Sequence, residues 1–99
     1  MTVREWLELT DQKSNAYLVR PRAVCNDGVR LSIQCSSFHY RRVTSKGIVL
    51  SVEVQAPDVE ELKPFIDEED ADICAYLDID LLEHIVAKHG GIVGASKET

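Results

Sequence analysis

Apolar and polar side chains alternate strictly over residues 29–36, and apolar residues occupy every second position of residues 17–25, 48–56 and 73–79. A period of two is typical of strands that bury one face and expose the other. The first three stretches therefore predict an antiparallel meander, and the last predicts a fourth strand.

The connection between the first two strands ends in Gly28. A three-residue loop, with Gly28 in the left-handed region as a bulge, pairs residue 25 with 29 and residue 23 with 31 and brings the apolar side chains onto one face. In this register Arg20, Arg22 and Arg30 share the solvent face. Because Pro21 has no N–H for a strand ladder, we expect the first strand to lie at a sheet edge.

Helices are expected at both ends of the chain. Thr2 and Glu5 form a capping box ahead of a helix over residues 3–10, and Asp80 and Glu83 form a similar pair for a helix over residues 81–89. Two glycines end the second helix, and the tail from about residue 95 is expected to fray.

A one- or two-turn helix is expected after Pro57, with Asp58 as its N-cap and Pro64 as its end. The predicted fold is a single α+β domain over residues 1–99, an antiparallel sheet of about four strands flanked by an N-terminal and a C-terminal helix.

Composition agrees with one hydrophobic core, since the chain has 99 residues of which 44% are hydrophobic. No apolar stretch reaches the ~18 residues of a membrane span, and the N-terminus lacks the apolar region of a signal peptide. The cysteines Cys25, Cys35 and Cys74 show no Cys-x-x-Cys spacing, so we interpret them as buried thiols. These features predict a cytoplasmic protein that does not contact membranes.

Charge divides the chain into two unlike halves. Residues 1–50 hold eight basic and four acidic residues, net +4, whereas residues 51–99 hold three and thirteen, net −10. We name residues 58–72 the acidic segment; its carboxylates are Asp58, Glu60, Glu61, Asp67, Glu68, Glu69, Asp70 and Asp72. Such asymmetry indicates either a charged interaction surface or internal pairing of the two halves.

The basic half offers a second candidate surface. Its arginines Arg20, Arg22, Arg30, Arg41 and Arg42 could hold a phosphate or a nucleic-acid backbone. The last two lie in residues 41–47, which read as a mobile basic connection. No aromatic residue is interleaved on the predicted arginine face to stack bases, so an exposed sheet face with arginines opposite Glu53 is the simpler interpretation.

Enzyme chemistry has little support in the sequence. It contains no phosphate-binding glycine motif, no Gly-x-Ser-x-Gly and no His-Glu-x-x-His. Cys35 and His39 could form a nucleophile–base pair or part of a metal site, but Cys35 falls in the apolar register. The acidic segment lacks the glycine and the terminal glutamate of a calcium-binding EF-hand loop. We therefore expect no catalytic residue, cofactor or metal.

One resemblance covers about three quarters of the chain. Val24–Gly28 leading into Leu31–Cys35 and Phe38–Tyr40, then Ser51–Val54 and Ile85–Gly91, resemble a group of small proteins encoded by phages and integrated mobile elements of Gram-positive gut bacteria. The resemblance implies a setting in which small acidic proteins often block a host machine, anti-CRISPR and other anti-defence inhibitors among them.

The leading hypothesis is a non-enzymatic inhibitor whose acidic segment imitates the charge of a nucleic acid. It would bind a basic groove on a host nucleic-acid-handling or defence protein. The alternative is a nucleic-acid or nucleotide-binding module that uses the arginine face.

Overall fold

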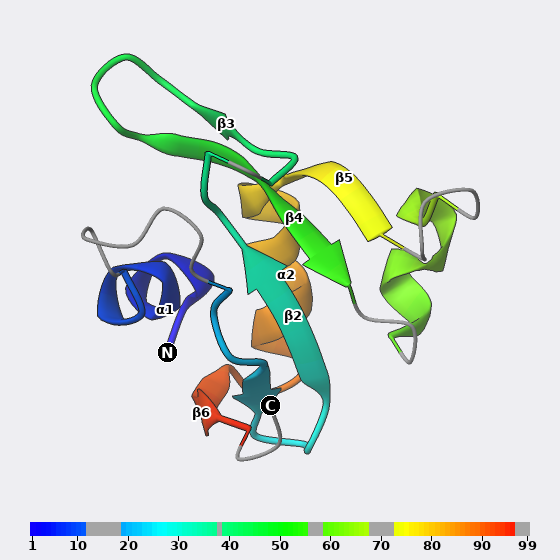
Figure 1. Ribbon diagram of the computed structural model, residues 1–99. Coiled ribbons are helices and arrows are strands. Elements are labelled where there is room, and N and C mark those ends of the chain that lie inside the picture. Colours follow the sequence, from blue (N-terminus) through cyan, green and yellow to red (C-terminus); the bar gives the residue numbers. More distant parts are fainter. Residues whose placement is uncertain (12–18, 38, 56–58, 68–72, 97–99) are drawn as a thin grey trace.

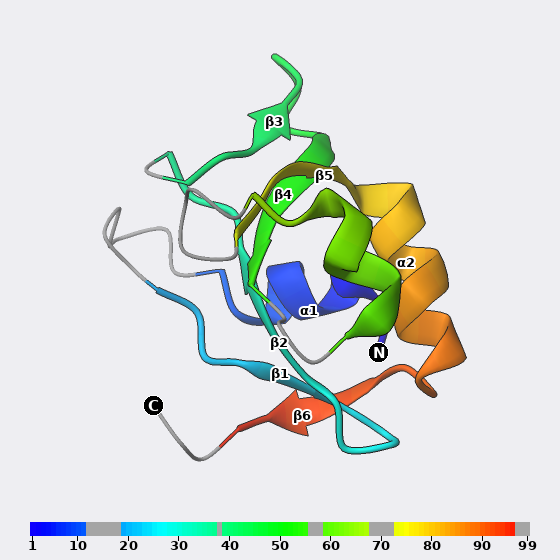
Figure 2. The same ribbon diagram turned by 90° about the vertical axis from the view of Figure 1, so that its right-hand side faces the viewer.

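In the computed structural model of the chain, the described residues form an antiparallel sheet of six strands, and both of their α-helices pack on the same side of it (Figures 1 and 2). The structure describes residues 1–11, 19–37, 39–55, 59–67 and 73–96. The predicted α+β class with an antiparallel sheet and a helix near each end is confirmed, but the strand count of about four is wrong.

The strands are β1 (Ala23–Cys25), β2 (Arg30–Gln34), β3 (Arg42–Val43), β4 (Val49–Gln55), β5 (Ile73–Asp78) and β6 (Ile92–Ala95). Their order is β3-β4-β2-β1-β6, with β5 also paired to β4. The two additional strands are β3, in the stretch expected to be a mobile connection, and β6, which begins directly after the double glycine. Pairing with β1 keeps residues 92–95 in the sheet. Residues 97–99, most of the tail that is expected to fray, lie outside the described part.

The predicted turn between β1 and β2 is confirmed. Ala23 pairs with Leu31, the Cys25 N–H donates to the Val29 carbonyl at 2.8 Å, and Gly28 has a φ of +91°. The strand itself is shorter than expected and lies between β2 and β6 rather than at an edge. Pro21 precedes its first residue, so the missing N–H costs the ladder nothing.

Helix α1 (Val3–Leu9) has the predicted capping box of Thr2 and Glu5. Helix α2 (Ile79–Lys88) begins earlier than expected, with Asp78 as its N-cap. The carboxylate of Glu83 instead accepts the Val3 N–H at 2.5 Å and the Arg4 N–H at 3.3 Å. It thus caps α1, whose first-turn N–H groups have no partner within their own helix.

A 3-10 helix, η1 (Glu60–Phe65), stands where the short helix was expected. Its N-cap is Val59, which makes no side-chain capping bond, and Pro64 lies inside the helix rather than at its end. The expected N-cap Asp58 lies outside the described residues. Leu62 is buried and fixes η1 to the core.

Two strands depart from simple alternation. In β4, Val52 and Val54 are buried as predicted, but Leu50 is exposed. In β5 the buried residues are Cys74 and Leu77, three positions apart, rather than every second residue. The cause is Tyr76, whose φ of +53° breaks the extended backbone between them.

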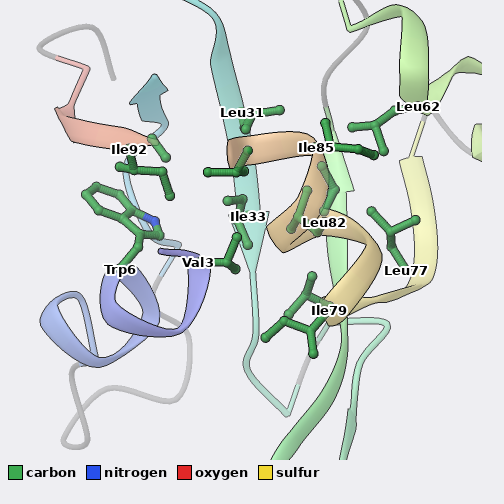
Figure 3. Close-up of a cluster of buried hydrophobic side chains, with 14 of the residues drawn as sticks. Val3, Trp6, Leu31, Ile33, Leu62, Leu77, Ile79, Leu82, Ile85 and Ile92 are labelled. Carbon is green, nitrogen blue, oxygen red and sulfur yellow. The ribbon is translucent and has the colours of Figure 1, made fainter. Parts of the chain in front are cut away.

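One hydrophobic core joins the helices to the sheet (Figure 3). Trp6 from α1, Leu31 and Ile33 from β2, and Leu82 from α2 are each almost completely buried. Ile92 of β6 packs into the same cluster, which explains why the chain returns to the sheet after α2.

Candidate functional site

Arg20 is buried, with 8% of its surface exposed, so its predicted place on a solvent face is wrong. Its guanidinium donates to the Thr10 hydroxyl at 2.9 Å and to the carbonyls of Cys35 and Leu7 at 3.3 Å each. The Asp11 carboxylate lies 3.9 Å away. Burial of this charge is tolerated because its donors have partners.

Gln34 explains how the Arg20 backbone is held. The side-chain amide of Gln34 accepts the Arg20 N–H at 2.8 Å and donates to the Arg20 carbonyl at 3.0 Å. The side chain of Gln34 thus makes the two hydrogen bonds to the Arg20 backbone that a neighbouring strand would otherwise make. The pairing turns Arg20 towards α1 and away from Arg22 and Arg30, which are both exposed.

The other arginines are also separated by the fold. Arg41 lines a cleft together with Arg20 and with Arg4, which sequence reasoning did not single out. Arg42 lies over the ring of Tyr76, 5.5 Å from its centroid. The five predicted anion-binding arginines therefore do not form one surface.

Tyr40 and Tyr76 form an aromatic pair on the surface, with ring centroids 5.7 Å apart. The Tyr76 N–H donates to the Tyr40 carbonyl at 3.2 Å. Tyr76 has its backbone in the left-handed region, which a bulky residue adopts only when its surroundings impose it. We call Tyr40, Arg42 and Tyr76 the tyrosine–arginine patch. Sequence analysis did not predict this patch, because Tyr76 is far from Tyr40 and Arg42 in the chain.

His39 does not act as the base of Cys35. Its Nδ1 lies 2.5 Å from the Ser36 hydroxyl, and its Nε2 lies 4.0 Å from the Glu53 carboxylate. Burial raises the pKa of the Cys35 thiol, and the positive charges of Arg41 and Arg20 offset this only in part. Burial also raises the pKa of the Cys25 and Cys74 thiols, so all three cysteines are protonated thiols at neutral pH.

The acidic segment is described at three of its eight carboxylates. Glu60 pairs with Lys63 at 2.7 Å, Glu61 pairs with His89, and Asp67 is exposed and bridges to Ile73 through its backbone. The remaining members, Asp58, Glu68, Glu69, Asp70 and Asp72, lie outside the described residues. In Figure 1, η1 projects from the body of the protein next to β5, on the side away from α1.

His89 joins three elements at the end of α2. Its Nδ1–H donates to Asp27 in the β1–β2 turn at 2.5 Å, and its Nε2–H donates to Glu61 of η1 at 2.7 Å. Only the imidazolium carries a proton on both nitrogens, so two ionised carboxylates favour the charged form. The hydrogen bond to Asp27 is the main cause of a raised His89 pKa, and the hydrogen bond from His89 is the main cause of the lowered pKa of both carboxylates.

No cluster of three or more histidine, cysteine, aspartate or glutamate side chains suited to a metal ion occurs in the described part of the chain. Nor is any described helix long and apolar enough to cross a bilayer. Comparisons with protein-family models, with curated proteins and with solved structures found no match to this chain.

Proposed function

We propose that this chain is a non-enzymatic interaction protein of a phage or mobile element, and that its acidic segment binds a basic groove on a host nucleic-acid-handling or defence protein. The proposal makes it an inhibitor that competes with nucleic acid for the same groove, in the manner of an anti-CRISPR protein.

The main support for the proposal comes from the residues that form ion pairs with Glu60 and Glu61 of the acidic segment. Glu60 and Glu61 pair with Lys63 and His89, which both belong to the acidic half of the chain. Two arginines of the basic half are engaged elsewhere, Arg20 with α1 and β2 and Arg42 with Tyr76. A third, Arg4, lies 3.7 Å from Asp80 of the acidic half, outside the acidic segment. Internal pairing of the two halves therefore does not neutralise these two carboxylates, which favours the interaction-surface interpretation of the charge asymmetry.

The attachment of the segment to the core also supports a docking role. Leu62 and Val59 are buried, and the backbone of Asp67 forms a bridge with that of Ile73. Charges held near a fixed base lose less conformational entropy on binding than charges on a free tail. Concentrated negative potential would also accelerate the encounter with a basic groove.

Capture from host lysate with the wild-type protein and a triple variant, Glu68→Lys, Glu69→Lys and Asp70→Lys, tests the proposal. A matched control reverses three carboxylates outside the segment: Glu8→Lys, Asp80→Lys and Glu98→Lys. The wild type and the control should retain the same protein, identified by mass spectrometry, whereas the segment variant should lose it.

The captured protein should bind nucleic acid, and added double-stranded DNA should displace the wild-type chain from it. Association should slow at least tenfold in the segment variant at low salt, because steering depends on the lost charges. Equal capture by both triple variants would overturn the assignment to the acidic segment.

The tyrosine–arginine patch favours nucleic-acid binding as a second candidate function. Tyrosine rings can stack on bases and Arg42 can meet a phosphate, a combination typical of single-strand binding. Wild-type protein should then bind a fluorescent oligothymidylate, and Tyr76→Asn should weaken binding about tenfold or more. No binding at low salt would dismiss this candidate.

A further inference from the structure

A cleft of about 520 Å³ lies between α1 and the β3–β4 hairpin. Its size falls within the range of small-molecule sites, roughly 300–1,000 Å³. In Figure 1 these two elements face each other on the side of the molecule away from η1, so the cleft is separate from the acidic segment.

Two kinds of side chain line the cleft. Leu7, Val43, Ile48 and Val49 supply apolar walls. Arg4, Arg20 and Arg41 bring three positive charges, and Glu8 and Asp11 bring two negative ones. The charged side chains on the described lining thus sum to +1. Arg4 lies 3.7 Å from Asp80 and Arg20 lies 3.9 Å from Asp11, so Arg41 is the lining arginine for which the described residues supply no ion pair, and one such cation suits a ligand with one negative charge.

The cationic side of the cleft has an unused donor. The Nε–H of Arg41 is buried and has no hydrogen-bond partner. Buried polar groups are almost always paired, so the Arg41 guanidinium lacks one of the hydrogen bonds that would offset the burial of its charge. Arg20 beside it is immobilised by its bonds to Thr10, Cys35 and Leu7 and supplies a fixed positive charge.

Arg41 and Arg20 both act electrostatically on Cys35. The positive charges of Arg41 and Arg20 both lower the pKa of the Cys35 thiol against the larger effect of burial, so both lie within electrostatic reach of this residue in the cleft wall. An anionic group next to Cys35 would experience the positive charges of Arg41 and Arg20, while an attached apolar chain could lie along Leu7 and Val49.

We propose that this cleft binds a small organic carboxylate with a short apolar chain, held by the guanidinium of half-buried Arg41 and by the apolar walls. Carboxylates match guanidinium donors in geometry and charge, and such charge-assisted bonds are about twice as strong as neutral ones. The site is independent of the proposed function, because it uses neither the acidic segment nor the tyrosine–arginine patch.

Octanoate is the probe, and octanol, octylamine and acetate are its controls. Wild-type protein, titrated by calorimetry, should bind octanoate at least tenfold more tightly than octanol or octylamine, which lack the carboxylate, and than acetate, which lacks the chain. Equal affinity for octanol and octanoate would overturn the proposal, because the arginines would then contribute nothing.

Variants assign the contact to Arg41. Arg41→Gln should weaken octanoate binding at least tenfold, and Ile48→Ser should weaken it several-fold at an exposed position where folding is not at risk. Arg22→Gln removes an equally charged but exposed arginine outside the cleft and should bind as the wild type does. An Arg41→Gln protein with the wild-type circular dichroism spectrum and unchanged affinity would overturn the assignment.

Two readouts need no variant. Octanoate should shift the Nε–H resonance of Arg41 in nitrogen–proton correlation spectra, and it should slow alkylation of Cys35 by N-ethylmaleimide several-fold. Cys25 and Cys74 are buried and serve as internal controls. An unshifted Arg41 signal or unprotected Cys35 at saturating octanoate would place any binding elsewhere and refute the site.

Discussion

The β1–β2 and β3–β4 hairpins have the same turn but different surroundings. In the first, the Cys25 N–H donates to Val29 and the Gly28 N–H donates to Cys25, at 2.8 and 2.9 Å. In the second, the Thr44 N–H donates to Ile48 and the Gly47 N–H donates to Thr44, at 2.9 Å each. Both turns have three residues and end in a glycine of positive φ, +91° at Gly28 and +85° at Gly47.

The hairpins differ in what covers them. Leu31 of β2 is 0% exposed and lies in the core, whereas Leu50 of β4 is 50% exposed and Ile48 is 53% exposed. The alternating pattern is similar in both sequences. Figures 1 and 2 show that the β3–β4 hairpin extends beyond the helices. An apolar face is therefore buried only where another layer packs on it.

The largest expected difference comes from one substitution made in each hairpin. Leu31→Ala should lower the free energy of unfolding by about 2–5 kcal/mol, because it leaves a cavity in the core. Leu50→Ala should lower it by about 0.5 kcal/mol or less, as is usual for surface sites. Urea denaturation followed by circular dichroism measures both. Comparable losses would mean that the β3–β4 hairpin is covered in solution, for example by a second chain.

Substitutions of the two turn glycines allow the hairpins to be compared at similar backbone strain, because both glycines have a similar positive φ. No atom lies within 4 Å of an added Cβ at Gly28 or Gly47, so a substitution at either meets only the unfavourable φ. Gly28→Val should cost about 1–2 kcal/mol of global stability. This turn cannot open alone, because the Asn26 N–H bonds to the Gly91 carbonyl at 3.0 Å and Asp27 bonds to His89.

Gly47→Val should cost much less globally, because the tip of the β3–β4 hairpin can relax without disturbing the core. Its effect should appear as faster hydrogen exchange of the Thr44 amide. Equal global costs at the two glycines would show that both hairpins unfold with the whole protein.

The stability of the β1–β2 hairpin should depend on pH through His89. Since its pKa is raised in the folded state, mainly by the hydrogen bond to Asp27, its contribution is complete below about pH 6.5 and is lost as the pH rises through the folded value. The lowered pKa values of Asp27 and Glu61 give the opposite dependence, with a contribution present above about pH 4.5 and lost in more acidic solution.

The stability difference between wild type and His89→Gln should therefore be greatest between about pH 4.5 and pH 6.5 and shrink as the pH rises through the raised pKa of His89. Thermal unfolding at several pH values measures it. Lys88 is the other charged group that acts on Glu61 and is unchanged in the variant. A difference that stayed constant with pH would contradict the charged His89 link.

A small effect is expected at Tyr76, whose ring lies under Arg42 of β3. Tyr76→Asn removes the ring but keeps a residue that tolerates positive φ, so it separates the contact from the backbone strain. Global stability should fall by about 1 kcal/mol or less, the value typical of an exposed cation–π contact. Hydrogen exchange in β3 and its turn should accelerate, while the β1–β2 turn should stay protected.

Sequence analysis correctly predicted the structural features that depend on residues close together in the chain. The capping box of Thr2 and Glu5, the β1–β2 register and the left-handed Gly28 each depend on side chains a few positions apart. The β3–β4 turn carried the same signal, since Gly47 closes a three-residue loop as Gly28 does. It was missed because the arginines beside it suggested a connection without structure.

The candidate site was harder to predict, because its groups meet from distant parts of the chain. Arg20 and Arg41 line one cleft with α1, and Tyr40 and Tyr76 meet across 36 positions of sequence. A surface charge pattern does not say which arginines the fold will bury. The segregation of acidic residues into the second half was visible in the sequence. Glu60 and Glu61 pair with Lys63 and His89 of the same half, so their ion pairs do not join the two halves.

The sequence by itself determined the α+β class, the antiparallel pairing of β1 with β2, and the apolar residues of β2 that contribute to the core. Local hydrogen bonds and hydrophobic periodicity are sufficient for these, because they act within one element or across one turn. The tertiary structure alone decided that Glu83 caps α1, that Gln34 turns Arg20 inward and that His89 joins Asp27 to Glu61. Each of these contacts pairs a polar group with a partner that only the packing of separate elements brings within reach.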